Sequence, residues 1–230
     1  MTTHVDKAVI NNIVWCEIVC ESHGISSIST KYLWGLRSKA PTFYPDVISS
    51  KQDATLEEVR RFISNKEVFS VKDSYASLNL STLGFQVLFE AEWISYESAK
   101  NTEPLKAEWE VITTEEKLVK WASSSGLEGV IKPTLLKRKD VKLFMCEEGD
   151  TMSGFIANVS NQVIGITNVF STNEEDNSVW GMIPKVVSSE FPKLPLVGYE
   201  HGESLQNASQ FGWKSMGPLR VWIKSDMESS

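Results

Sequence analysis

Residues 196–213 read LVGYEHGESLQNASQFGW, and the fold prediction starts from this stretch. It begins as an apolar run, turns polar and helix-compatible near Gly202, and ends on Gly212-Trp213. The segment GPLRVWIK that follows is rich in β-forming residues. The pattern predicts a strand over residues 194–200, a helix from about residue 203 to residue 211, and a closing strand.

The stretch at residues 69–94, FSVKDSYASLNLSTLGFQVLFEAEWI, has the same order of features. Each runs strand, acidic residue, short helix, Gly-aromatic pair and a strand ending in Trp-Ile. In this alignment Asp73 corresponds to Glu200, and Gly84 corresponds to Gly212. Chance recurrence of a common strand-helix-strand unit is the alternative. A true repeat predicts two related halves packed together, with a ligand cleft where they meet.

The remaining pattern mixes helices with many strands, which is typical of an α/β protein with a mixed sheet. Helices are expected at about residues 5–23, 54–65 and 114–124, and SVWGMIP at residues 178–184 is interpreted as a strand. The polar run at residues 95–106 is the best linker. We therefore expect a diverged half at residues 1–100 and a second half at residues 107–226.

Composition narrows the class of protein. The chain has 230 residues, of which 41% are apolar and 23% charged, with a net charge of −7. An acidic chain is poorly suited to nucleic acid or an anionic membrane, and no apolar run reaches the roughly 20 residues that span a bilayer. The N-terminus lacks the pattern of a signal peptide, and three cysteines form no disulfide framework. A cytoplasmic protein is predicted, with no nucleic-acid or membrane partner.

The order of segments in the second half carries a family resemblance. The relevant segments are GFIANVSNQVIGITNVFS (154–171), SVWGMIP, LVGYE and, after Gly212-Trp213, RVWIK. Residues 108–224 resemble the GNAT superfamily, the acyl-CoA N-acyltransferases. The resemblance implies a GNAT-like mixed sheet and acyl transfer from acetyl-CoA, and the repeat would make the first half a more diverged copy.

Two features that the family uses for acetyl transfer are not matched. The resemblance implies a cofactor-binding segment of the type Gln/Arg-x-x-Gly-x-Gly/Ala after SVWGMIP, where Gly lets the backbone approach a pyrophosphate. The sequence there is KVVSSEFPKLP, which has no Gly. It also implies a Tyr general acid four residues before the terminal Gly-aromatic pair, but Ala208 and Leu80 occupy those positions. Both departures predict that ordinary acetyl transfer is lost.

The candidate catalytic residues lie where the stretch turns from apolar to ionisable. Glu200 and His201 end the predicted strand, at the edge of the sheet where ligands bind in open α/β proteins. His201 can titrate near neutral pH, and Tyr199 is the nearest residue able to replace the missing acid. A surface histidine and structural carboxylates are the alternatives, in which Glu200 or Asp73 pairs with Arg220 or Lys72.

Further candidates line the expected cleft. Asp73 is a ligand-binding candidate because it corresponds to Glu200. The aromatic residues Phe43, Tyr44, Trp180, Trp213 and Trp222 are most simply core, and Tyr44 and Trp180 are the two that we place at a ligand.

One helical face superficially suggests a metal. Cys16, Cys20 and His23 share it with Val9 and Ile13. Because free Cys commonly packs as a small hydrophobe, core packing is the preferred interpretation and no metal is predicted.

Two functions remain open. The first is an atypical GNAT-like protein, without ordinary acetyl transfer, that binds a small-molecule ligand or a protein partner in the cleft between the halves. The second is an active GNAT-type N-acetyltransferase with a rebuilt acetyl-CoA site and Glu200 or His201 as general base. No cofactor is firmly predicted, and acetyl-CoA or CoA is left open.

Overall fold

The computed structural model describes residues 3–97, 108–173 and 175–224. The helices, including two short 3₁₀ segments, are α1 (His4–Ser22), α2 (Leu56–Ile63), η1 (Ser81–Leu83), α3 (Glu115–Ser125), η2 (Pro133–Lys137), α4 (Val179–Glu190) and α5 (Gly202–Gln210). The strands are β1 (Ser27–Ser29), β2 (Leu33–Leu36), β3 (Val47–Ser49), β4 (Ser70–Asp73), β5 (Phe85–Tyr96), β6 (Glu110–Val111), β7 (Val141–Glu148), β8 (Thr151–Ser160), β9 (Val163–Ser171), β10 (Leu196–Glu200) and β11 (Lys214–Lys224).

All these strands form one mixed sheet, in the order β1-β2-β3-β4-β11-β5-β10-β9-β8-β7-β6. The pairs β3-β4 and β9-β10 are parallel, and the other neighbours are antiparallel. The predicted α/β class with a mixed sheet is confirmed. The sequence predicted two halves packed together, whereas the structure has one continuous sheet, because β5 pairs with β10 and β11 pairs with β4.

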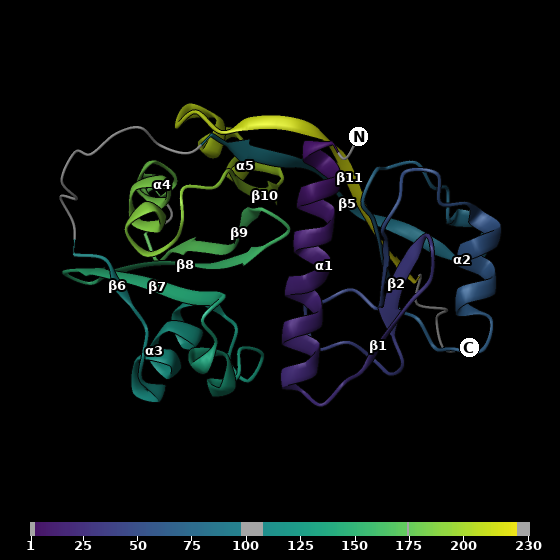
Figure 1. Cartoon of the computed structure of the whole chain (residues 1–230), viewed down its shortest axis with the longest axis horizontal. Coiled ribbons are helices and arrows are strands. Elements are labelled where there is room, and N and C mark those ends of the chain that lie inside the picture. Colours follow the sequence, from purple (N-terminus) through teal and green to yellow (C-terminus); the bar gives the residue numbers. More distant parts are fainter. Residues whose placement is uncertain (1–2, 98–107, 174, 225–230) are drawn as a thin grey trace.

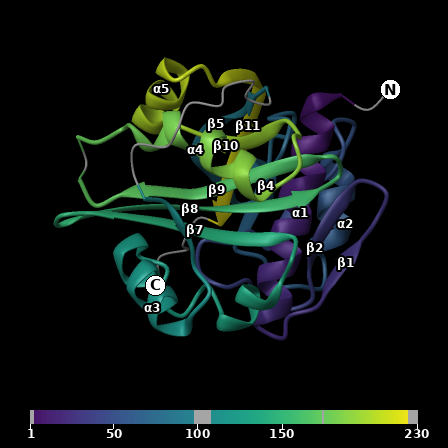
Figure 2. The same ribbon diagram turned by 60° about the vertical axis from the view of Figure 1, so that its left-hand side comes forward.

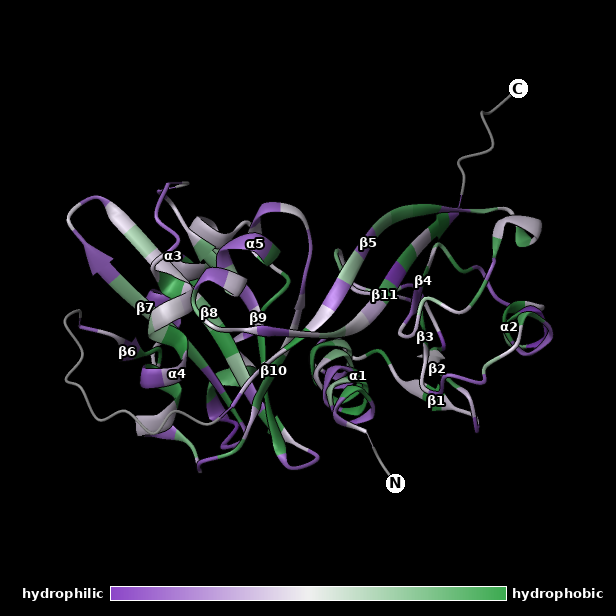
Figure 3. Ribbon diagram, turned by 90° about the horizontal axis from the view of Figure 1, so that it is seen from above, coloured by the Kyte–Doolittle hydropathy of each residue, from purple (hydrophilic) through white to green (hydrophobic). Residues whose placement is uncertain are grey.

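The sheet bends around α1. Figure 1 shows this helix at the centre of the molecule, with β6 to β9 on one side and β1, β2 and α2 on the other. Seen from above, β5 and β11 pass beside α1, which is viewed end-on, and connect the two sides (Figure 3). The helix therefore lies where residues from β4 and β10 meet, although β11 and β5 separate those strands in the sheet.

The sequence of α1 explains its boundaries and its central position. Thr3 and Asp6 form a reciprocal capping box at its start, and Gly24, with φ of 74°, follows its end. Its buried residues occur at positions around most of the helix: Ala8, Val9, Asn11, Trp15, Cys16, Ile18, Val19 and Cys20. A helix that is apolar on so many sides is expected to be packed from several directions.

Most elements of the second half match the prediction. The turn between β8 and β9 has positive φ at Asn161 and Gln162, as a tight hairpin requires. The strand-helix-strand order of β10, α5 and β11 is also confirmed. Figure 2 shows β7, β8 and β9 side by side, with α3 below them and α4 and α5 above.

The predicted strand SVWGMIP is wrong, because residues 179–184 begin helix α4. Its buried residues Val179, Trp180 and Ile183 recur at helical spacing rather than alternating. Pro184 lies inside this helix and has no N–H for the carbonyl of Trp180. That carbonyl accepts instead from the indole of Trp213, at 3.2 Å. Trp213 therefore fixes α4 to the end of α5.

Other boundaries also differ from expectation. The apolar-polar segment EWEVIT, residues 108–113, is typical of a strand, but only Glu110–Val111 form one, β6, and the short strands β1, β2 and β3 were not predicted. The predicted linker at residues 95–106 begins inside β5, and its residues 98–107 lie outside the described residues. None of the helices among the described residues has the length and apolar character needed to cross a bilayer.

Candidate functional site

A cavity of about 540 Å³ opens beside the ends of β9 and β10, on the side facing β4. Its volume lies within the range of small-molecule sites. Four of the predicted site residues line this cavity together: Tyr44, Tyr199, Glu200 and His201. The remaining walls are Phe43, Pro45, Ser70, Lys72, Leu88, Phe89, Thr167, Asn168, Val169, Val221 and Ile223.

The cavity exists because β9 and β10 pair only briefly. Their parallel register covers Leu196 with Ile164 and Val197 with Gly165. Beyond it, β9 carries one residue more than β8 between the pairs Gly154–Phe170 and Ile156–Thr167. Asn168, with φ of 53°, lies in this bulge and lines the cavity. A bulge of this kind redirects side chains at the point where pairing ends.

A tightly anchored loop forms another wall. Residues 40–46 are held by Asp46, whose buried carboxylate accepts the backbone N–H groups of Ala40, Phe69 and Ser70. Phe43 in this loop has φ of 71°, which is unusual for a bulky residue, and 75% of its surface is exposed. The prediction that Phe43 is core is wrong, because the loop holds its ring at the edge of the cavity. Tyr44, the next residue, is buried.

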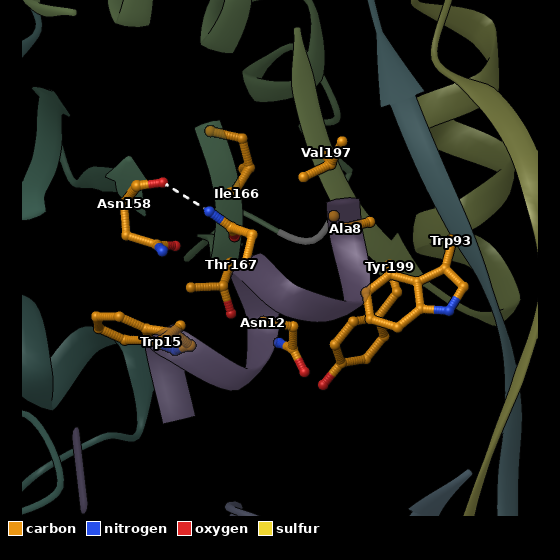
Figure 4. A pocket seen from close by; sticks show the side chains of 12 residues that line it. Ala8, Asn12, Trp15, Trp93, Asn158, Ile166, Thr167, Val197 and Tyr199 are labelled. Atoms are coloured by element: carbon orange, nitrogen blue, oxygen red, sulfur yellow. Dashed lines mark hydrogen bonds between the residues drawn. The ribbon is translucent and has the colours of Figure 1, made fainter. Parts of the chain in front are cut away.

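Lys72 brings three elements together at the inner end of the cavity. Its side-chain ammonium donates to Oδ1 of Asn12 on α1 and to the hydroxyl of Tyr199 on β10, each at 3.0 Å. Figure 4 shows the ends of Asn12 and Tyr199 facing one another beneath α1. The hollow drawn there is only about 10 Å³ and shares Thr167 and Tyr199 with the larger cavity. It has room for about one water molecule.

The hydroxyl of Tyr44 is buried and makes no hydrogen bond of regular geometry, although the side chain of Trp15 lies close enough to lower its pKa. Burial raises the pKa of Tyr44 well above its usual range, and the nearby Cys16 thiol adds to this. The group therefore remains a neutral hydroxyl that can donate one hydrogen bond. A buried hydroxyl without a regular hydrogen bond is costly, so a further polar partner would stabilise it.

Glu200 and His201 form the opposite, more open side. Glu200 is partly buried, and desolvation raises the pKa of its carboxyl from 4.5 to about 8. No described residue makes a hydrogen bond or ion pair with its side chain. The ring of His201 is exposed and stacks on Phe89, with ring centroids 4.7 Å apart. The suggested ion pair with Arg220 is not formed, because Arg220 binds Glu90 at 2.6 Å.

Asp73 and Trp180 lie away from this cavity. The carboxylate of Asp73 is fully buried and accepts from the backbone N–H groups of Tyr75 and Leu78 and from the hydroxyl of Ser49. Burial raises the pKa of Asp73, and these hydrogen bonds oppose the shift. Its partners make Asp73 the organiser of the turn after β4. Trp180 is buried in α4 and lines a separate hollow of about 300 Å³.

The start of α4 tests whether an acyl-CoA pyrophosphate fits the chain in the usual way. Because SVWGMIP is helical, the segment that precedes this helix is STNEEDNS, residues 171–178, rather than KVVSSEFPKLP. The carboxylate of Asp176 already accepts the N–H of Ser178, at 2.9 Å. Glu203 lines the same hollow as Asp176. Two carboxylates where a helix start would receive phosphate do not fit a pyrophosphate.

The missing general acid is also a feature of the structure. Ala208 and Leu80 are fully buried in the core, so neither position can exchange protons with a ligand. Tyr199, the suggested replacement, has its hydroxyl at Lys72.

The Cys16 and Cys20 face is core, as predicted. Both thiols are buried, and burial raises the pKa of Cys20 to about 12. The ring of His23 lies 2.7 Å from the carbonyl oxygen of Val130. Among the described residues, no three His, Cys, Asp or Glu side chains lie close enough to hold a metal ion.

Comparison with solved structures identifies the fold. A conserved protein of unknown function from Staphylococcus epidermidis aligns with a TM-score of 0.62, over 87% of this chain and 94% of its own, at 10% identity. A protein provisionally called a GNAT-family acetyltransferase, from Novosphingobium aromaticivorans, aligns with a TM-score of 0.56, over 94% of this chain and 99% of its own, also at 10% identity. The fold is that of the GNAT N-acyltransferases.

At this level of identity the likeness shows the GNAT fold alone. No protein-family model matches the chain, and no curated protein is detectably similar to it in sequence. The cavity and its side chains therefore carry the information on activity.

Sequence reasoning missed several lining residues. The sequence indicated Lys72 only as an ion-pair partner, and it carried no signal for the lining residues Asn168 and Leu88 or for Asn12, which binds Lys72. A lysine inside the predicted strand at residues 68–73 was the one available signal, because a charge is seldom buried without a reason.

Proposed function

We propose that this protein is an atypical GNAT-fold protein that binds a small molecule in the cavity beside β9 and β10, without ordinary acetyl transfer. The observation that carries the proposal is the convergence of Lys72, Tyr44, Tyr199 and Glu200 on one cavity of about 540 Å³ with apolar walls. A mostly apolar pocket with a few converging polar groups is the usual form of a ligand site. A variant of this proposal is that a protein partner binds at the same opening, where the exposed ring of Phe43 offers it an apolar contact.

The start of α4 supports the absence of ordinary acetyl transfer. Asp176 already takes the N–H of Ser178, and Glu203 adds a second carboxylate to the same hollow. Both would repel a pyrophosphate. Ala208 at the position of the general acid points the same way.

The second candidate is an N-acetyltransferase with Glu200 or His201 as general base. It is favoured by one observation, the pKa of about 8 at Glu200, because a base works best with a pKa near the working pH. The residues at α4 do not fit the usual cofactor site, so an active enzyme would need a different one.

Titration with acetyl-CoA and with CoA by calorimetry separates the candidates. We expect no binding at about 100 μM, a concentration within the usual range of KM values. Saturable binding, with acetyl transfer to an amine that is lost in Glu200→Gln, would establish the second candidate instead.

Occupancy of the cavity needs its own test. N-phenylnaphthylamine is a neutral apolar dye whose fluorescence rises in apolar sites, and we expect it to bind saturably. A bulky substitution in the wall, Val169→Trp, should abolish its binding, whereas Val119→Trp on an exposed part of α3 should not. Absence of dye binding to the unmodified protein would contradict the proposal.

We also propose that residues 1–100 and 107–226 are diverged copies of one unit. The pairing pattern supports this, since on each side two successive antiparallel pairs lead to a parallel pair, β3-β4 or β9-β10, and β6-β7 adds a third antiparallel pair on the second side. Gly84 and Gly212 both adopt positive φ, at 79° and 90°, before an aromatic residue. In this proposal the copies exchange their last strands, which places the cavity between them.

A further inference from the structure

Lys72 is a buried charge with no counter-charge. Only 3% of its surface is exposed, and no described carboxylate forms an ion pair with it. Its two recorded acceptors, Asn12 and the Tyr199 hydroxyl, are neutral. An ammonium group has three donors, so one remains for a further acceptor. Burying a cation without an anion is costly, which makes an anionic partner the expected completion of this site.

Tyr44 provides a second, independent observation at the same cavity. Its hydroxyl is buried and makes no hydrogen bond of regular geometry, with Trp15 beside it, and the side chains of Tyr44 and Lys72 both line the cavity. The loop that carries it is fixed by Asp46, so the hydroxyl is held in place. A cation and a neutral hydroxyl donor in one cavity can together donate to an anion.

The remaining lining indicates the size and charge of that anion. Lys72 is the sole Lys or Arg side chain among the described lining residues, whereas Glu200 adds a potential negative charge. One cation balances a single negative charge and would leave the second charge of a phosphate unpaired. The rest of the wall is largely apolar, with Leu88 and Phe43 exposed at 53% and 75%.

We propose that the cavity recognises a monocarboxylate with an apolar body, an inference that rests on the proposed function. Lys72 and Tyr44 bind the carboxylate, and the apolar body lies against Phe89, Val221 and Ile223. Phe43 and Leu88 form an apolar rim that gains cover when the ligand binds.

The experiment measures displacement of N-phenylnaphthylamine by three probes with the same chain, namely octanoate, octanamide and octyl phosphate. We expect octanoate to displace the dye at a concentration at least about tenfold below that of octanamide, because only the acid can form charge-assisted hydrogen bonds. Octyl phosphate should be weaker than octanoate. Equal potency of acid and amide, or a stronger phosphate, would overturn this inference while the dye still reports an occupied cavity.

Variants assign the preference to residues. Lys72→Met keeps the length of the side chain and removes the charge, so the ratio of the displacing concentration of the amide to that of the acid should fall from about ten to about one. Tyr44→Phe should lower that ratio severalfold without lowering the melting temperature, because the hydroxyl lost makes no hydrogen bond of regular geometry in the protein. Lys214→Met, an exposed lysine on β11, is the matched control and should keep the full ratio.

If Lys72→Met does not fold, Tyr44→Phe still tests the pair of donors, and an unchanged ratio in Tyr44→Phe would overturn the inference. If the dye itself does not bind the unmodified protein, the proposed function fails first, and the carboxylate site fails with it.

Discussion

At the scale of single residues, Glu200 is the group whose protonation should most affect the folded state. Its carboxyl has a pKa of about 8 in the fold, against an ordinary value of 4.5, because burial disfavours the charged form. The folded state therefore holds a proton that the unfolded chain releases. The free energy of unfolding should fall as pH rises from about 5 to about 8, and be unaffected by this group below about pH 4.

Glu200→Gln should remove this pH dependence. At about pH 9 we expect the variant to be more stable than the unmodified protein by about 1–2 kcal/mol, with little difference at about pH 4. This difference in the free energy of unfolding is smaller than the full shift in the pKa of Glu200 would give, because the side chain is only partly buried. Urea unfolding across this pH range measures it. Glu203→Gln, which changes an exposed carboxylate two helix positions from His201, is the control. A difference that does not vary with pH would contradict the prediction.

The same residues show what the sequence could predict of the site. Tyr199, Glu200 and His201 could be placed at a strand end, because the change from apolar to ionisable residues is local. Lys72 could not be assigned, because its burial depends on α1 and β10, which lie about 60 and 127 positions away in the chain. Asp73 was predicted to bind ligand because the sequence aligns it with Glu200, but the backbone of its own turn takes up its carboxylate.

At the scale of elements, the contact between α1 and β9 decides how closely the helix approaches the sheet. A Cβ at Gly165 would lie 1.9 Å from Oδ1 of Asn11 and 2.6 Å from Oδ1 of Asn158. Asn11 is itself fixed, since its side-chain amide donates to the carbonyl of Asn158 and to the hydroxyl of Ser160. Glycine at this position therefore sets the position of the helix that carries Asn12 toward Lys72.

Gly165→Ala should destabilise the protein by about 2–4 kcal/mol, because α1 must move or Asn11 must lose its buried hydrogen bonds. Chemical denaturation gives the free energy of unfolding. Gly149→Ala is the control, since Gly149 has φ of 61° but nothing within 4 Å of an added Cβ, and backbone strain alone should cost about 1 kcal/mol. Equal costs at the two positions would show that the helix contact is not tight.

Helix α4 shows where prediction of elements failed. SVWGMIP has the apolar density of a strand, and Pro184 favours ending a helix rather than continuing it. The structure accommodates Pro184 because Trp213 supplies the hydrogen bond that the Trp180 carbonyl would lose. That compensation comes from a residue 33 positions away, so local pattern could not reveal it. The strands β1 and β3 are only three residues long, too short for alternation to be recognised.

At the scale of the whole molecule, the pairing of strands from both sides at the centre of the one sheet should make folding all-or-none. β5 has its antiparallel neighbours in β10 and β11, whereas β4 depends on β11. A chain that ends after β5 would leave β4 without β11, and a chain that begins at β6 would leave β10 without β5. In both cases long rows of backbone N–H and carbonyl groups would lose their partners, and the apolar surface around α1 would be exposed.

We therefore expect the fragments 1–97 and 108–230 to be unfolded or aggregated alone, and to form a folded one-to-one complex when refolded together. Circular dichroism and size-exclusion chromatography of each fragment and of the mixture provide the measurement. Binding of N-phenylnaphthylamine should appear only in the mixture, because Lys72 and Tyr44 come from the first fragment while Tyr199 and Glu200 come from the second. A second fragment that unfolds cooperatively by itself would show that the GNAT-like half is complete without β5. The cavity would then be a contact between two independent units, rather than a consequence of the shared sheet.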